Sequence, residues 1–190
     1  MSREGNGESV YDDKRRQFLK AVGLGGIVGL GTAWFALSLP LEVRPWTVLL
    51  ATYAHAGPAH LFANALGLVL VGPLVEHGTT RLRFHAFFAG AGAIAGLSEV
   101  LVSGVTGPAT AVLGGSGAVF ALLGYAVTGN RVVGRVFDRV EVDRSLTLGL
   151  FVVVAAALTV ATAAPGLALV AHFTGLLVGL LAGRRRLLRV

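Results

Sequence analysis

Apolar residues in this chain come in six long blocks, separated by short stretches of polar and charged residues. Within each block the apolar positions are nearly continuous, unlike the one-sided pattern of a soluble helix or strand. Each block approaches the roughly 20 residues that a helix needs to cross a hydrocarbon core about 30 Å thick. Because backbone groups in that core have no water to bond, the blocks are predicted to be helices. We place them at about 19–39, 59–76, 84–103, 114–129, 146–163 and 167–183.

The composition agrees with a membrane environment. Hydrophobic residues make up 54% of the chain and charged residues 14%, whereas about a quarter of the residues in a soluble domain are charged. We therefore predict an all-α membrane protein, a bundle of six transmembrane helices spanning residues 19–184. Residues 1–18 are polar and expected to be disordered in the cytoplasm, and residues 185–190 form a basic cytoplasmic tail.

Basic residues predict the orientation of this bundle. Of the 16 Lys and Arg, all but Arg44 flank the apolar blocks on one side. Because Lys and Arg concentrate on the cytoplasmic side of a bilayer, both termini are expected in the cytoplasm and the chain in the cell membrane. The same asymmetry accounts for the net charge of +6. A lipid bilayer is therefore the expected partner of these charges, and nucleic acid is not.

Two features of the chain limit other interpretations. The start KRRQFLK resembles a twin-arginine export signal, but the five later blocks are not a folded passenger, so a basic anchor for a retained first helix is favoured. Small residues before Pro40 leave processing near that position as the alternative. The absence of cysteine excludes disulfides, thiol catalysis and cysteine-based metal sites.

The strongest chemical signal is Ser116, which stands where a Gly-rich loop runs into the fourth block. Gly114, Gly115 and Gly117 surround it, so nothing bulky blocks its hydroxyl. Amides at the start of a helix lack intrahelical partners and lie at the positive end of the dipole. The amides of Gly115 and Ser116 could therefore bind a developing oxyanion. The alternative is a serine that packs helices together, which is common in membrane bundles.

His172 is the second signal, near the outer end of the sixth block. An ionisable residue at membrane depth is costly and is a functional candidate by default. Small residues recur on its helical face, and the fourth block carries a matching set. These are Gly175, Gly179 and Gly183 in the sixth block and Gly117, Ala121 and Gly124 in the fourth. If the two faces pack together, the imidazole of His172 meets Ser116 and can take its proton.

His60 and Asn64 are the third signal, at the start of the second block. Their spacing places both on one helical face, one turn apart. Both side chains can donate hydrogen bonds, as an oxyanion hole requires. The alternative is a satisfied polar pair that joins two helices. His55, just before this block, is interpreted as an ordinary loop or interface histidine.

Three segments resemble the signature segments of rhomboid intramembrane serine proteases, in the order of that family. They are HAGPAHLFANALGLVLVGPLVEHG, GGSGAVFALLGY and AHFTGLLVG. The resemblance covers roughly residues 43–183. It implies a rhomboid-like bundle and a serine endopeptidase that cleaves transmembrane segments of other membrane proteins. No cofactor and no metal ion are expected.

The resemblance also implies roles for individual residues. Ser116 corresponds to the nucleophile and His172 to the general base of a dyad without a carboxylate member. His60, Asn64 and the backbone around Gly115 correspond to the oxyanion donors. Other positions are implied to pack around the site, with Phe120 where the family often has an aromatic ring on the base. These positions are Gly114, Gly117, Phe120, Gly175 and Gly179.

The connection between the first two blocks departs from the family pattern. The family usually has a long, partly embedded loop there, often with a Trp-Arg pair, whereas residues 40–58 alone join the blocks here. The apparent counterpart of that pair is Arg44-Pro45-Trp46. Glu76 matches a family glutamate near the cytoplasmic end of the second helix and is interpreted as structural.

Two other functions compete with proteolysis. A non-catalytic rhomboid-like scaffold that binds transmembrane helices would be expected to lack Ser116 or His172, and both are present. A small transporter or metal carrier could use the histidines of the blocks. Its weakness is that Glu99 is the only acidic residue well inside the outer half of a block, because a cation path at membrane depth needs acidic partners.

Overall fold

A computed structural model of the chain describes residues 34–107, 110–129, 143–162 and 168–189. In these ranges every regular element is a helix, and the only strand-like pairing is an isolated antiparallel bridge between Leu37 and Val112. The all-α fold class predicted from the sequence is therefore confirmed. The predicted segment 1–18 and most of the predicted first helix lie outside the described residues.

The end of that first helix was placed too late. Residues 36–39 are described and are not helical. The N–H and C=O of Leu37 both bond to Val112, at 2.8 and 2.9 Å, and are unavailable to a helix. Pro40 also disfavours helical backbone in the residue before it. The apolar composition of this stretch reflects burial of Leu37, not continuation of a helix.

Five long helices follow, and none of their ends differs from the predicted blocks by more than three residues. They are α4 (Pro58–Glu76), α5 (Arg81–Thr106), α6 (Ser116–Gly129), α8 (Arg144–Ala161) and α9 (Leu169–Arg184). Local chemistry marks their starts: α4 begins with a proline, which fits the first helical position. The side chain of Thr80 caps α5, and that of Asp143 caps α8.

The chain is a membrane protein, and its described helices differ in whether they are long enough to cross a bilayer. Among the described residues, α4 and α5 are long and apolar enough to cross a bilayer, whereas α6, residues 145–161 of α8, and α9 are shorter apolar helices. Large side chains of α4 such as Phe62, Val69 and Leu74 are mostly exposed. An exposed apolar face of this kind is suited to lipid.

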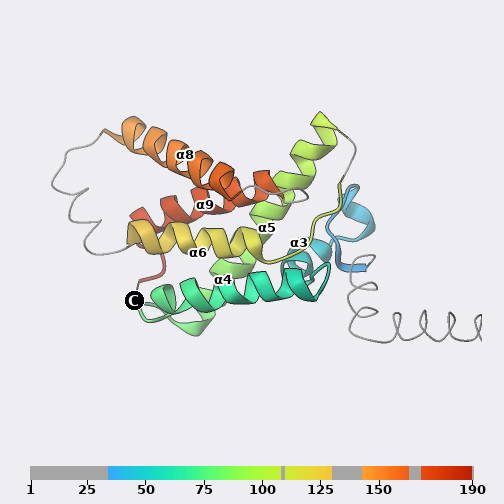
Figure 1. The fold of residues 1–190 in the computed structure, drawn as a ribbon, viewed down its shortest axis with the longest axis horizontal. Coiled ribbons are helices and arrows are strands. Elements are labelled where there is room, and N and C mark those ends of the chain that lie inside the picture. Colours follow the sequence, from blue (N-terminus) through green and yellow to red (C-terminus); the bar gives the residue numbers. More distant parts are fainter. Residues whose placement is uncertain (1–33, 108–109, 130–142, 163–167, 190) are drawn as a thin grey trace, which may run out of the picture.

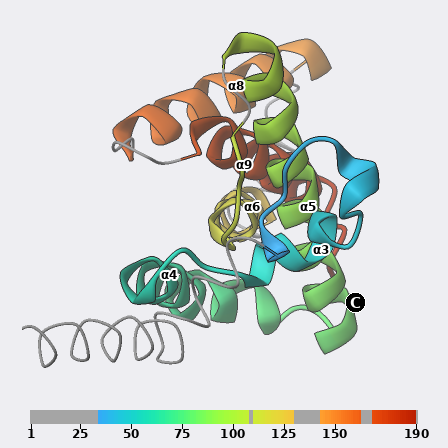
Figure 2. The same cartoon turned by 90° about the vertical axis from the view of Figure 1, so that its right-hand side faces the viewer.

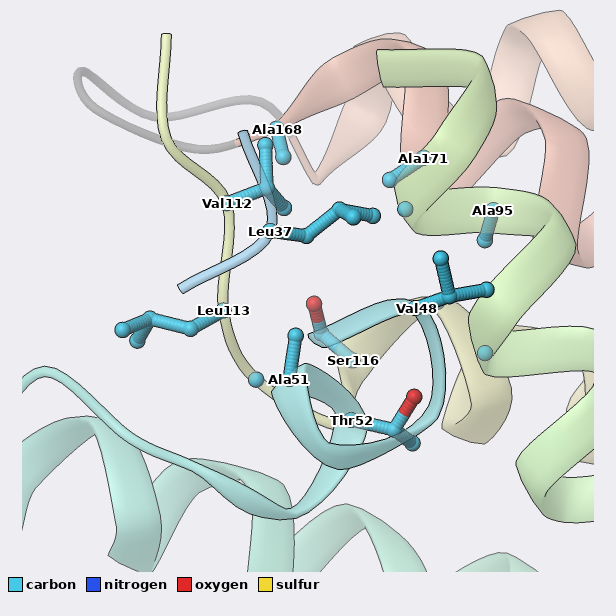
Figure 3. Close-up of a pocket in the computed structure, with 14 residues that line it drawn as sticks. Leu37, Val48, Ala51, Thr52, Ala95, Val112, Leu113, Ser116, Ala168 and Ala171 are labelled. Atoms are coloured by element: carbon cyan, nitrogen blue, oxygen red, sulfur yellow. The ribbon is translucent and has the colours of Figure 1, made fainter. Parts of the chain in front are cut away.

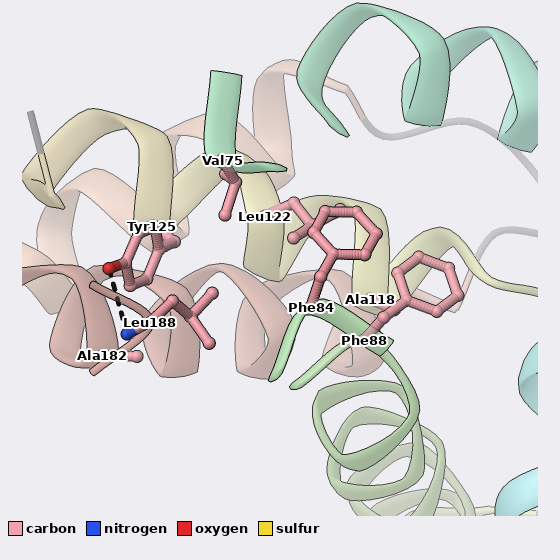
Figure 4. Close-up of a cluster of buried hydrophobic side chains, with 8 residues drawn as sticks. All are labelled: Val75, Phe84, Phe88, Ala118, Leu122, Tyr125, Ala182 and Leu188. Atoms are coloured by element: carbon pink, nitrogen blue, oxygen red, sulfur yellow. Dashed lines mark hydrogen bonds between the residues drawn. The ribbon is translucent and has the colours of Figure 1, made fainter. Parts of the chain in front are cut away.

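Helix α6 lies at the centre of the bundle. It packs against α9, α5 and α4, while α8 packs on α9 (Figure 1). Figure 2 looks nearly along α6 and shows the other helices around it. Its inner face supplies Ala118, Leu122 and Tyr125 to a buried cluster that also includes Phe84 and Phe88 of α5 (Figure 4). A residue at the start of α6 is therefore held by three neighbouring helices.

The chain after α9 returns to this cluster. Leu188 is buried in it, and its N–H donates to the Tyr125 hydroxyl at 3.1 Å (Figure 4). Arg189 donates to the carbonyl oxygen of Gly129, and its own carbonyl accepts from Arg83 at 3.0 Å. The predicted basic tail, 185–190, therefore includes residues that close one end of the bundle.

Glycines bring α6 and α9 into backbone contact. A Cβ at Gly175 would overlap the carbonyl of Gly117, and one at Gly179 would overlap that of Ala121. A Cβ at Gly124 would in turn overlap the Leu176 carbonyl. Close approach of two backbones through small residues is the packing mode of many membrane helices. This contact fixes the position of α9 along α6. It therefore also fixes how the side chains of the two helices lie relative to each other.

The short connection between the first two predicted blocks is structured. It forms a 3₁₀ turn η1 (Leu41–Val43), a short helix α3 (Thr47–Leu50) and a second 3₁₀ turn η2 (Ala51–Tyr53). Thr47, Ala51 and Thr52 are buried, and α3 and η2 pack against α5. Few residues suffice because the chain folds directly back onto α5.

Candidate active site

Ser116 is the first residue of α6, at the end of an extended segment. Gly114 precedes it with φ of +116°, a conformation that glycine adopts readily and other residues rarely do. A Cβ there would also lie 2.5 Å from Cε1 of His60. The Gly114 N–H donates to the Ala51 carbonyl at 2.8 Å. Residues of η2 therefore hold the turn that presents Ser116.

His172 of α9 reaches Ser116 directly. Its Nε2 lies 3.0 Å from Ser116 Oγ, which is hydrogen-bonding distance between a nucleophile and a base. His172 is 4% exposed. Phe120, one turn after Ser116, stacks on the imidazole with ring centroids 4.4 Å apart and planes at 17°. The ring is therefore held between the serine hydroxyl at its edge and an aromatic face.

No side chain hydrogen-bonds to the second ring nitrogen of His172 within the part of the chain that the structure describes. His172 Nδ1 is buried and has no hydrogen-bond partner there. For Nε2 to accept the serine proton, the neutral ring must carry its hydrogen on Nδ1. The arrangement is a Ser–His pair without the carboxylate that holds Nδ1 in a catalytic triad.

His60 lies beside Gly114, in the turn before Ser116. A backbone N–H sets the tautomer of its imidazole ring. The Ala56 N–H donates to His60 Nδ1 at 3.3 Å. With Nδ1 as acceptor, the neutral ring carries its hydrogen on Nε2. A Cβ at Gly114 would be 2.7 Å from that Nε2 atom, so the donor edge of the ring lies over the Gly114 turn.

Asn64 lies one turn further along α4 and is 8% exposed. Its Nδ2 donates one hydrogen to the His60 carbonyl at 2.9 Å. The amide nitrogen carries a second hydrogen, which no hydrogen bond within the described residues uses. Its Oδ1 would be 3.6 Å from a Cβ at Gly115. The oxygen of the side-chain amide therefore faces the same turn as His60, and it is buried without a hydrogen-bond partner among the described residues.

These side chains line one cavity of about 270 Å³ between α4, α6 and α9. The end of α8 contributes Thr162 to its wall. The structure thus brings Ser116 and His172 together with both predicted oxyanion donors. The other lining residues are Ala63, Gly67, Val119 and Phe120.

A second, much smaller cavity of about 20 Å³ lies on the other side of Ser116. Figure 3 shows the serine hydroxyl facing it, with side chains from α5, α9, η2 and the Leu37–Val112 bridge around it. A cavity of this size accommodates about one water molecule.

Three other ionisable residues that the sequence analysis named are not part of the Ser116–His172 pair. Glu76, the last residue of α4, is exposed and is not among the residues that line the cavity beside Ser116 and His172. His55 precedes α4, and its ring meets that of His60 edge-on, with centroids 5.3 Å apart. Burial and then the nearby charge of His60 lower the pKa of His55 below its usual value of 6.5. The side chain of Glu99 contacts α9.

Sequence reasoning missed two contributors to the site. Thr52 is buried beside it: a Cβ at Gly92 would lie 2.6 Å from its hydroxyl oxygen, and one at Gly115 would lie 3.2 Å from its carbonyl. Glu99 accepts a hydrogen bond at 2.9 Å from the backbone N–H of Ala171, next to His172. No local signal marks either contact, because the partners are distant in sequence.

The histidines do not form a metal centre in the described part of the chain. No three His, Cys, Asp or Glu side chains come close enough there to hold a metal ion. A site built on His55, His60 and His172 would need further donors.

Comparisons with known proteins point to one family. Residues 42–189 match the family profile described as Rhomboid domain. The chain is 38% identical over 85 residues to Rhomboid-related protein 3 of Homo sapiens, covering 44% of this chain and 20% of that protein. It is 34% identical over 80 residues to Putative rhomboid protease YdcA of Bacillus subtilis (strain 168), covering 42% of this chain and 38% of that protein. Each alignment thus spans well under two thirds of the relative's own length.

Proposed function

Since the chain belongs to the rhomboid family, we propose that it is an intramembrane serine endopeptidase that cleaves transmembrane segments of other membrane proteins. The observation that carries the proposal is the 3.0 Å contact between His172 Nε2 and Ser116 Oγ. One of the two relatives is named a putative rhomboid protease. The two groups have the geometry of a nucleophile and its general base.

The chemistry follows from these two groups. Ser116 Oγ bonds to the scissile carbonyl carbon while its proton passes to His172 Nε2, and the carbonyl electron pair moves to oxygen. His172 then returns the proton to the leaving amine nitrogen as the C–N bond breaks, which leaves an ester on Ser116. A water molecule attacks that ester after giving a proton to His172, and Ser116 regains its proton as the acid departs.

Donors around the serine turn would stabilise the oxyanion. His60 offers its Nε2–H, and Asn64 offers the second hydrogen of Nδ2. The amides at the start of α6 precede its first intrahelical bond, from Val119 N–H to the Gly115 carbonyl, and so remain available. Donors fixed before the reaction cost no reorganisation when the charge develops.

The cavity and the length of α6 support access from the membrane. A helix of 14 residues is about 21 Å long, shorter than a hydrocarbon core of about 30 Å. With both termini cytoplasmic and the chain in the cell membrane, Ser116 would lie below the outer surface. The cavity has α4 on one side and Thr162, at the end of α8, in its wall. A substrate helix would enter between these two elements and unwind at the cleavage site.

The test uses full-length protein in liposomes with a fluorescent transmembrane substrate. Ser116→Ala and His172→Ala should each abolish cleavage, and fluorophosphonate labelling should be lost with Ser116. The matched controls are Ser98→Ala, which removes a hydroxyl bonded to its own helix, and His85→Ala, which removes an exposed imidazole. Both should cleave as the wild type does. Cleavage that survives Ser116→Ala would exclude the serine mechanism. Folded wild-type protein that binds transmembrane segments without cutting them would identify a scaffold.

A further inference from the structure

Glu99 of α5 contacts α9, the helix that carries His172, at the residue before that histidine. Its Oε2 accepts a hydrogen bond at 2.9 Å from the backbone N–H of Ala171. Ala171 immediately precedes His172 in the first turn of α9. The contact joins α5 to α9 across 72 positions of sequence.

The first turn of α9 lacks a cap of its own. Its N-cap residue, Ala168, has no side chain that can accept a hydrogen bond. The first bond within the helix runs from the His172 N–H to the Ala168 carbonyl at 3.0 Å. The N–H of Ala171 is therefore the last one before intrahelical bonding begins, and it needs an outside acceptor. Glu99 supplies that acceptor, with a carboxyl oxygen at the positive end of the helix dipole.

Packing one turn before Glu99 on α5 also holds the first turn of α9 in place. Ala95 lies one turn earlier on α5, on the same face as Glu99. A Cβ at Gly117 would lie 2.6 Å from the Ala95 Cβ and 3.4 Å from the Ala171 carbonyl oxygen. Figure 3 shows Ala95 and Ala171 near Ser116. Three helices thus meet at Ala171, which precedes His172 on α9 and lies beside Gly117, the residue after Ser116 on α6.

We infer that Glu99 is a positioning residue, which holds the first turn of α9 so that His172 Nε2 stays within hydrogen-bonding distance of Ser116. The inference rests on the proposed function. Glu99 does not line the catalytic cavity, so it acts through the α9 backbone and not on substrate. Its loss should therefore lower kcat and leave KM unchanged, because substrate binding does not involve it.

Two variants of equal side-chain length test the hydrogen bond. Glu99→Met removes the acceptor oxygens but keeps the volume and suits an apolar surrounding, whereas Glu99→Gln keeps one acceptor oxygen. Ser98→Ala is the control on the same helix. Displacement of a catalytic group by about 1 Å can cost about a hundredfold in rate. A looser first turn should cost roughly tenfold in kcat for Glu99→Met, and Glu99→Gln should restore most of it.

Residue-resolved amide exchange in detergent provides a readout independent of activity. The Ala171 N–H should exchange about fivefold faster in Glu99→Met, as loss of a helix cap of about 1 kcal/mol predicts, and near the wild-type rate in Glu99→Gln. Unchanged kcat and unchanged Ala171 exchange in Glu99→Met would overturn the inference. So would a raised KM at constant kcat. Failure of the wild type to label with a fluorophosphonate would instead overturn the proposed function, while the exchange would still report whether Glu99 caps α9.

Discussion

Gly175 of α9, three residues after His172, is in backbone contact with Gly117 of α6, the residue after Ser116. The contact lies between the Ser116–His172 pair and the remainder of the α6–α9 interface. Any atom added there must push the helices apart, because the obstacle is a backbone carbonyl and not a flexible side chain. The separation of Ser116 and His172 therefore depends on the absence of a side chain at Gly175.

Gly175→Ala should separate α6 from α9. The added methyl would overlap the Gly117 carbonyl, and overpacking of this kind costs about 1–3 kcal/mol. The larger effect should be on chemistry, with fluorophosphonate labelling of Ser116 slowed about a hundredfold. Thermal unfolding in detergent and the labelling rate measure the two effects. Gly149→Ala on α8 is the control, since a Cβ there meets nothing within 4 Å. Equal labelling by the two variants would show that the contact does not set the dyad.

Asn64→Ala should slow catalysis without weakening substrate binding. Removing one preorganised oxyanion donor costs about 10²–10³ in kcat in soluble proteases, and His60 can compensate for part of that loss. Asn64→Asp keeps the shape but replaces donors with acceptors, so it should be at least as slow. Steady-state kinetics on a transmembrane substrate separate kcat from KM. An unchanged kcat in both variants would identify Asn64 as a packing residue.

The helical faces of α6 and α9 could be predicted from the sequence because their small residues recur at the helical period. Gly175 and Gly179 fall on the side of His172 without any knowledge of the partner helix. The contact of Glu99 with Ala171 could not be predicted this way. A single carboxylate in an apolar block reports that something satisfies it, but not which of several distant backbone groups does so.

Among the described residues, backbone pairing explains why the end of the first predicted helix was placed too late. Residues 36–39 are as apolar as the helix predicted before them, and Leu37 is 1% exposed. Hydrophobicity indicates burial, but it does not distinguish a helix end from an extended segment bonded to Val112. The burial of Leu188 was missed for a related reason, because the four arginines around it suggested a solvated tail.

Leu188→Ala should destabilise the protein although it lies after the last helix. The side chain is 5% exposed and packs with Tyr125 and Ala182, and loss of a buried leucine costs about 2–5 kcal/mol. Tyr125→Phe should cost about 1 kcal/mol, because the Leu188 N–H loses its acceptor. Leu187→Ala, at a position 59% exposed, is the control and should change little. Thermal unfolding in detergent measures all three; similar losses at 187 and 188 would contradict the packing described.

Stability should fall as the pH drops below about 6.5, through His55. This residue lies before α4, with Nδ1 bonded to the Tyr53 carbonyl at 3.2 Å and Nε2 buried without a partner among the described residues. Burial, and then the charge that His60 would carry, lower the pKa of His55. Above pH 6.5 the imidazole is neutral in both the folded and the unfolded chain, so its ionisation contributes no pH dependence there. Below that value the unfolded chain takes up the proton first, and folding becomes less favourable.

Thermal unfolding between pH 7.5 and 5.5 tests this argument with two substitutions. His55→Asn removes the imidazole that faces His60, so the midpoint should fall less steeply with pH than in the wild type. His85→Asn changes an exposed histidine on α5 and should leave the slope as it is. Protonation at Nε2 would place a second donor in a buried site with no acceptor among the described residues, so part of the wild-type slope should be lost with His55. Parallel pH curves for the wild type and His55→Asn would show that another group controls the acid response.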